Sequence, residues 1–183
     1  MKSIIQFRHA FSSLLLLLSF AATTQSCMAQ AGRGPSTEEE RTRVGQLALA
    51  ADKDPLAVMA SPDSQWFQKW VDEVPDYQFG PDSASFWLMS GAAKGTFKKV
   101  MEFHQLVSVA AYQVQHNVFD PRKNSEMQAA TTLAGVEGIL RAYETMLPKY
   151  PDIRSDKMEE AIKQRNAGKL AQFVQALPPM PSR

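Results

Sequence analysis

The sequence predicts an all-α protein, a single compact domain of six or seven helices after a cleaved signal peptide. The 183 residues are 44% hydrophobic and 21% charged, which is the composition of a globular protein. Beyond residue 35, apolar residues recur at the three- and four-residue spacing of amphipathic helices. Alternation typical of a strand is confined to the short segment Tyr77-Gln78-Phe79. We therefore expect little or no sheet.

The first thirty residues have the order of a secretory signal peptide. Lys2 and Arg8 form a positive start, Leu14 to Leu18 form the apolar centre, and Ala29-Gln30-Ala31 is a small-residue triplet. The apolar stretch falls short of the roughly 20 residues that span a bilayer. We expect export to the periplasm or the medium, with cleavage after Ala31. The alternatives are a buried N-terminal helix and a lipoprotein whose acylated Cys27 attaches it to a membrane.

Removal of the signal peptide changes the charge and the thiol content. Without residues 1–31 the chain keeps 152 residues, 18 basic and 19 acidic, and it has no cysteine. An exported chain without a thiol depends on packing, because it forms no disulfide. The balanced charge argues against nucleic-acid binding. The predicted organisation is a flexible leader at 32–35, a helical domain at 36–177 and a Pro-rich tail at 178–183.

Capping residues and prolines mark the elements of the first half. Ser36 and Glu39 have the spacing of a capping box. Proline at the first position of a helix favours a start at Pro55 and at Pro62, and Pro75 ends the second of these segments. The predicted elements, in chain order, are a helix from about 36 to 52, a short turn at 55–59, a helix at 62–74, an extended segment at 77–79 and a helix at 83–93.

The second half contains the two longest helical patterns. The segment 96–116 is apolar around most of its circumference, so we expect it to be the most buried helix. A second long helix covers 125–147, and shorter ones cover 156–166 and 170–177. Gly135 and Gly138 lie inside the second long helix, where each glycine costs about 1 kcal/mol relative to alanine. They predict a tight crossing against helix 96–116, with space for a ligand or partner backbone as the alternative.

Motifs for catalysis and for cofactors are missing. The sequence has no HExxH, no CxxCH, no Glu-x-x-His, no Walker loop and no GxSxG. We expect no catalytic residue, no metal site and no cofactor, although a Ser, His and acid set on separate helices stays open. His104 lies on the apolar stripe of helix 96–116. Its functional interpretation is a general base or haem ligand. We favour a buried histidine hydrogen-bonded to a carbonyl or a neighbouring side chain.

Two groups of residues are candidates for ligand binding. Trp66, Trp70 and Phe86 bring large rings into one part of the chain and could form an apolar groove, although core packing is the favoured role. Other candidates are His104, Glu137 and Arg141. Glu137, Arg141 and Glu144 have the spacing of solvated ion pairs along one helix.

Three stretches of the chain carry a family resemblance. The chain resembles a group of small exported all-helical bacterial proteins of unknown function at Asp54-Pro55-Leu56, at Val74-Pro75-Asp76, and at Ala134-Gly135-Val136-Glu137-Gly138 with Arg141-Ala142-Tyr143-Glu144. The resemblance covers most of residues 50–175 and implies no activity and no site residues. In size and layout alone, the chain is similar to envelope proteins that bind and neutralise toxic effectors.

Export, balanced charge and missing catalytic motifs predict a non-enzymatic protein-interaction module of the bacterial envelope, with another envelope protein as its partner. The alternative is a helical bundle that binds a small apolar ligand at Trp66, Trp70 and Phe86. A third hypothesis is an enzyme with a dispersed site. It requires His104 to line a cleft beside a carboxylate or a hydroxyl.

Overall fold

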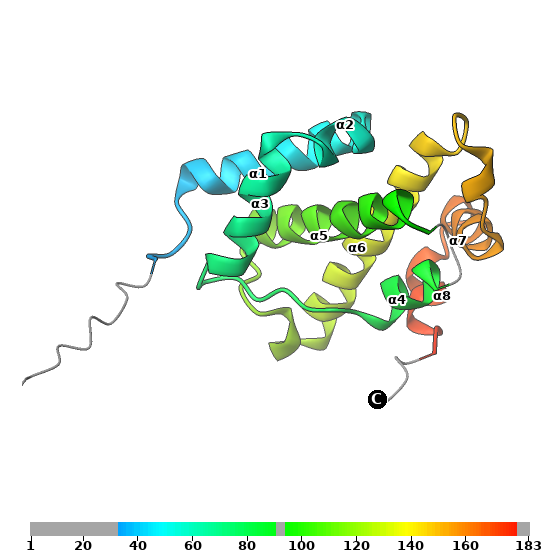
Figure 1. The fold of residues 1–183 in the computed structure, drawn as a ribbon. Coiled ribbons are helices and arrows are strands. Elements are labelled where there is room, and N and C mark those ends of the chain that lie inside the picture. The colour runs from blue at the N-terminus through cyan, green and yellow to red at the C-terminus, as the bar shows by residue number, and fades with distance from the viewer. Residues whose placement is uncertain (1–32, 91–93, 179–183) are drawn as a thin grey trace, which may run out of the picture. The chain divides into compact units, whose positions relative to one another are not determined.

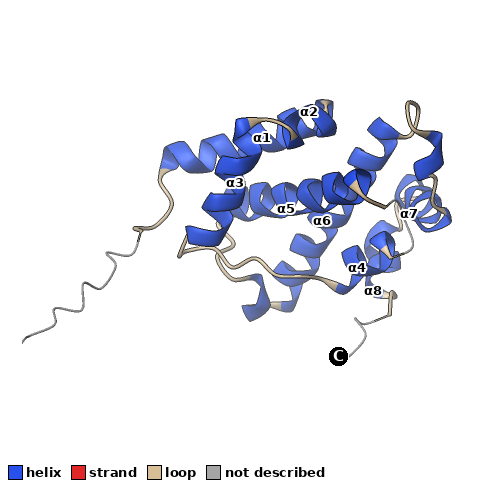
Figure 2. Ribbon diagram, viewed as in Figure 1, coloured by secondary structure: helices blue, strands red, loops and turns tan. Residues whose placement is uncertain are grey.

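The computed structural model describes residues 33–90 and 94–178, and these residues contain helices, turns and loops without a strand (Figure 2). The predicted signal peptide with Cys27, and residues 179–183 of the predicted tail, lie outside the described residues. The described elements are α1 (Glu38–Lys53), α2 (Pro55–Met59), α3 (Pro62–Glu73), α4 (Ser83–Met89), α5 (Thr96–His116), η1 (Pro121–Lys123), α6 (Ser125–Met146), η2 (Pro151–Ile153), α7 (Asp156–Asn166) and α8 (Leu170–Gln175).

The all-α prediction is confirmed, but the described residues contain eight α-helices where six or seven were expected. The short elements account for the difference. Asp54 ends α1 and begins α2, because its side chain accepts a 3.0 Å hydrogen bond from the Ala57 N–H. One capped turn therefore becomes a separate helix. Among the described helices, none has the length and apolar character needed to cross a membrane.

The predicted capping box of α1 is wrong by one residue. Thr37 and Glu40 form it: the Glu40 N–H donates to Thr37 Oγ1 at 3.2 Å, and the Thr37 N–H donates to Glu40 Oε2 at 2.9 Å. Ser36 donates instead to Asp76 after α3, from its N–H at 2.9 Å and from its hydroxyl at 2.7 Å. This tertiary partner satisfies Ser36, which leaves the cap to its neighbour.

Helix α5 is the central element of the unit formed by residues 33–183, and Figure 1 shows α1 lying along it. Its first turns supply Val100 and Met101 to a core shared with α4, α6, α7 and α8. Its later turns supply Phe103 and Val107 to a second core shared with α1 and α3. This double role explains why α5 is apolar around most of its circumference.

The two glycines of α6 form the predicted tight crossing against α5. A Cβ added to Gly138 would lie 2.2 Å from Ser108 Oγ and 2.9 Å from the carbonyl oxygen of His104. A Cβ added to Gly135 would lie 2.9 Å from Val109 Cγ2. Because residue 135 meets residue 109 and residue 138 meets residues 104 and 108, the helices run antiparallel. The crossing holds Arg141, one turn further along α6, against α5.

Candidate functional site

A groove with a volume of about 580 Å³ lies between α1, α5 and α6. Helix α5 supplies Ser108, Ala111 and Tyr112, and α6 supplies Ala134 and Arg141. The residues contributed by α1 are Arg41, Thr42, Gly45, Ala48, Leu49 and Asp52. Several lining residues are small, namely Gly45, Ala48, Ala111 and Ala134, and Asp52 meets Arg141 at one end of the groove.

Four polar side chains from three helices meet at that end of the groove. Arg141 Nε donates to Asp52 Oδ1 at 2.7 Å, and Arg141 Nη2 donates to Ser108 Oγ at 3.2 Å. His104 Nε2 lies 3.2 Å from the same Asp52 oxygen, and His104 Nδ1 lies 3.5 Å from Ser108 Oγ. Asp52 is the last groove residue of α1, and His104 and Ser108 are one turn apart on α5. The cluster therefore joins all three helices.

His104 is the innermost member of this cluster, with 0% of its surface exposed. Burial lowers the pKa of its imidazole below the ordinary value, against the opposing effects of the Asp52 carboxylate and the Ala51 carbonyl. The ring is therefore neutral at neutral pH. Its Nε2 lies close to Asp52 without the alignment of a hydrogen bond. His104 has the buried position that the sequence favoured. The neighbouring side chain at its Nδ1 is Ser108, at 3.5 Å, and Nε2 has no hydrogen-bond partner of good geometry.

The cluster contains an acid, a histidine and a serine, but their arrangement differs from that of an activated nucleophile. Ser108 is 5% exposed, and the backbone of Gly138 packs directly over its hydroxyl. Its oxygen accepts a hydrogen bond from Arg141, and the 3.5 Å to His104 exceeds the usual length of a hydroxyl hydrogen bond. The side chains of Asp52 and Arg141 are 31% and 38% exposed, so these two charges are what a ligand in the groove can contact.

The expected ion pairs along α6 are wrong. Arg141 pairs with Asp52 of α1, as described above. Glu144 accepts a 2.9 Å hydrogen bond from Arg165 Nη1 of α7, and Glu137 lies 3.7 Å from the same guanidinium. This contact raises the pKa of Arg165, mainly through the hydrogen bond that the guanidinium donates to Glu144. Arg141 therefore pairs with α1, whereas Glu137 and Glu144 both pair with α7. Glu137 takes no part in the groove.

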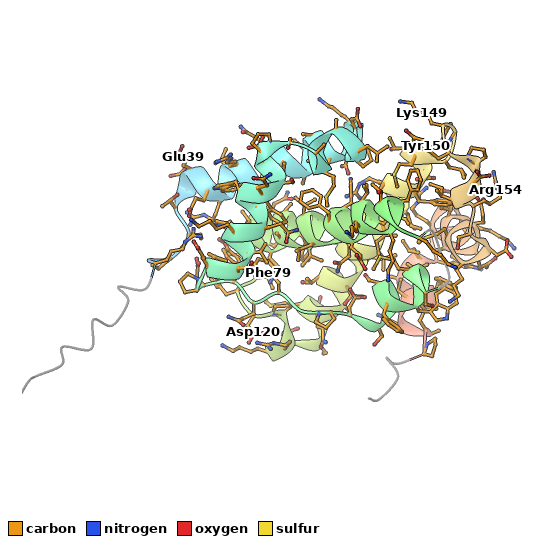
Figure 3. All side chains as sticks on the ribbon, viewed as in Figure 1. Glu39, Phe79, Asp120, Lys149, Tyr150 and Arg154 are labelled. Carbon is orange, nitrogen blue, oxygen red and sulfur yellow. The ribbon has the colours of Figure 1, made fainter. Side chains whose placement is uncertain are left out.

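The aromatic residues do not form one site. Trp70 is buried and packs against Trp66, Phe67, Tyr77 and Phe79, with ring centroids 5.8–6.3 Å apart. In Figure 3, Phe79 lies beside the lower end of α3. Among the described residues, no ring pair joins Phe86 to this group, and Phe86 is 48% exposed on α4. Trp66 and Trp70 therefore belong to a packed ring cluster.

The sequence analysis identified two of the four residues of the polar cluster, His104 and Arg141. Ser108 had a usable signal, because it lies four residues after His104 on the same stripe of α5. Asp52 had none, because the end of α1 alone does not say which helices pack against it. In the part of the chain that the structure describes, no group of three or more His, Cys, Asp or Glu could hold a metal ion.

Neither a protein-family model, nor a curated protein, nor a solved structure gives a match to this chain. The resemblance to small exported helical proteins therefore stays a prediction, and the groove has to be interpreted from its own geometry.

Proposed function

We propose that this protein is an exported, non-enzymatic interaction module of the bacterial envelope, and that it binds another protein along the groove between α1, α5 and α6. The observation that carries the proposal is the exposure of Leu49 beside this groove. This leucine is 65% exposed at the groove, more than any other large apolar residue among those described. Its position beside an open groove offers an apolar contact to a partner that enters the groove.

The dimensions of the groove favour a protein over a small ligand. Its α1 wall extends from Arg41 to Asp52, which corresponds to about three helical turns or about 16 Å. The small residues Gly45, Ala111 and Ala134 leave room for a backbone to approach closely. By contrast, the rings of Trp66 and Trp70 pack on one another and on their neighbours, so the small-ligand alternative loses its main support.

The polar end of the groove favours binding over catalysis. His104 is enclosed, and Ser108 is covered by α6. A substrate in the groove would meet the Asp52–Arg141 ion pair and would not meet the imidazole. Exposed charges beside an apolar groove orient a partner and exclude partners of the wrong charge pattern.

The test is site-specific photo-crosslinking in cells of the source organism. A photoreactive amino acid replaces Leu49 in one variant and Met127 in the other. Met127 is the matched control, because it is a large apolar residue, 45% exposed, on α6 and outside the groove. We expect one discrete protein adduct at position 49 and none at position 127. Equal labelling at both positions, or none at position 49, would contradict the proposal.

Export is tested separately by mass spectrometry of the protein recovered from the cell envelope. Cleavage after Ala31 predicts a chain that starts at Gly32. An intact N-terminus at Met1 would contradict export through this segment. A chain that starts at a lipid-modified Cys27 would favour the lipoprotein alternative.

A further inference from the structure

The groove surface of α1 carries both a projecting side chain and, one turn earlier, an open position. Leu49 projects from the helix with 65% of its surface exposed. One turn earlier, a Cβ added to Gly45 would have no other atom within 4 Å, so the surface there is open. Ala48 and Ala111 extend the depression with small side chains. A projection beside a depression on one surface is a property of a surface that can bind a copy of itself.

The charges of the same surface have a matching arrangement. Arg41 lies at one end of the α1 wall and Asp52 at the other end. Consider a two-fold axis that passes beside α1, perpendicular to the helix and level with the midpoint between residues 46 and 47. It pairs α1 antiparallel with a second α1, and it places Arg41 opposite the partner's Asp52. The same axis places Gly45 opposite the partner's Ala48.

Resting on the proposed function, we propose that the occupant of the groove is a second copy of this chain. The two α1 helices pack antiparallel about this axis, and Leu49 of each protomer fills the depression at Gly45 and Ala48 of its partner. Arg41 of each protomer lies near the carboxylate of the partner's Asp52. A single two-fold axis brings the apolar side chain to the depression and the opposite charges to each other, while Asp52 keeps its ion pair with Arg141 and Arg41 keeps its hydrogen bond to the Ser36 carbonyl. An unrelated partner would need each of these features separately.

The first test is the molecular mass in solution, measured by sedimentation on protein purified after expression of the full chain. We expect a dimer for the wild type, a monomer for Leu49→Lys and a dimer for Met127→Lys, all with the same helical circular dichroism. Leu49 has most of its surface in solvent, so Leu49→Lys leaves the fold of the protomer intact. Weaker association at higher salt is expected from the exchanged Arg41 and Asp52 contacts. A dimer that survives Leu49→Lys would overturn the proposal.

The second test fixes the register of the two helices. In a Cys27→Ser chain, which has no other thiol, Gly45→Cys introduces one thiol in each protomer. The axis places the two introduced thiols about 4.5 Å apart along the helices, since each residue rises about 1.5 Å. We expect a disulfide-linked dimer after mild oxidation. Gln46→Cys is the matched control. Gln46 follows Gly45 in the chain but lines a different groove, toward α2 and α3, so a thiol at this position should not form the disulfide-linked dimer.

The outcomes separate this inference from the proposed function. A wild-type chain that is monomeric at every concentration overturns the second copy as occupant. If the photoreactive residue at position 49 then labels a different protein, the binding function of the groove stands without the dimer. If the photoreactive residue labels no protein, both the dimer and the binding function of the groove are refuted.

Discussion

The tight crossing of α5 and α6 gives a prediction whose size and sign follow from the structure. Gly138→Ala adds a methyl group that would lie 2.2 Å from Ser108 Oγ, 2.7 Å from Ser108 Cβ and 2.9 Å from the His104 carbonyl oxygen. Backbone atoms cannot turn aside, so the two helices must separate. Overpacking of this kind costs about 1–3 kcal/mol, and replacing a helical glycine returns about 1 kcal/mol. The 2.2 Å contact places the cost in the upper part of that range, so we expect a net loss of about 1–2 kcal/mol in the free energy of unfolding.

Gly45→Ala is the matched control, because Gly45 is also inside a helix but has no other atom within 4 Å of an added Cβ. Only the helix propensity changes, so we expect a gain of about 0.5–1 kcal/mol. Gly135→Ala should fall between the two, because two of its three close contacts are with the flexible Gln105 side chain and the third is with a Val109 methyl group.

The assay is equilibrium urea unfolding at a low protein concentration, so that association does not contribute. The midpoint should fall for Gly138→Ala and rise for Gly45→Ala, with an unchanged m-value. Near 150 residues, each kcal/mol corresponds to a shift of about 2–4 °C in the melting temperature. A Gly138→Ala protein as stable as the wild type would refute the close approach of α5 and α6 at this position.

Three further predictions concern charged and titratable groups. Because the pKa of buried His104 is lowered, the unfolded chain binds more protons below the ordinary pKa of about 6.5. The contribution of His104 to the free energy of unfolding, measured with urea, should therefore be fully present above that pH and should be lost as the pH falls toward the folded pKa. His104→Gln should remove this dependence on pH, and a variant that keeps the same dependence would contradict the assignment to His104. Arg141→Met should lower the free energy of unfolding by about 1 kcal/mol, since both members of its ion pair are only about a third exposed. Lys98→Met is the control: its pair with Glu102 is more exposed, so the free energy of unfolding should change by only a few tenths of a kcal/mol. Lys157 Nζ donates to the carbonyl oxygens of Trp87 and Ser90 at 3.0 and 2.9 Å, so Lys157→Met should speed amide hydrogen exchange in α4 but not in α1.

The helices were largely predictable because their determinants are local. The long apolar pattern gave Thr96–His116 with the bounds that the structure has, and the end of α6 was placed within one residue. Asp54 and Pro55 fixed the start of α2 through a side-chain cap and a preset backbone angle. The capping box failed by one residue, because the sequence does not reveal that Asp76 accepts both hydrogen bonds from Ser36.

The candidate site was only half predictable. Arg141 and Glu137 lie one turn apart on α6, and their spacing favoured a pair with each other. In the structure Arg141 meets Asp52, 89 residues earlier in the chain, and Glu137 meets Arg165 of α7. Helical periodicity says which residues share a face, but it does not say which helix packs against that face.

The sequence by itself therefore determined an all-helical chain, the position of its long helices, the glycine crossing and the burial of His104. Each of these follows from spacing within one segment, where backbone hydrogen bonds and a 3.6-residue period leave few alternatives. Only the tertiary structure decided that Asp52, His104, Ser108 and Arg141 meet, and that Leu49 stays exposed beside a groove. These features depend on how three helices pack together, and side-chain contacts between distant segments are not encoded in the periodicity of any one of them.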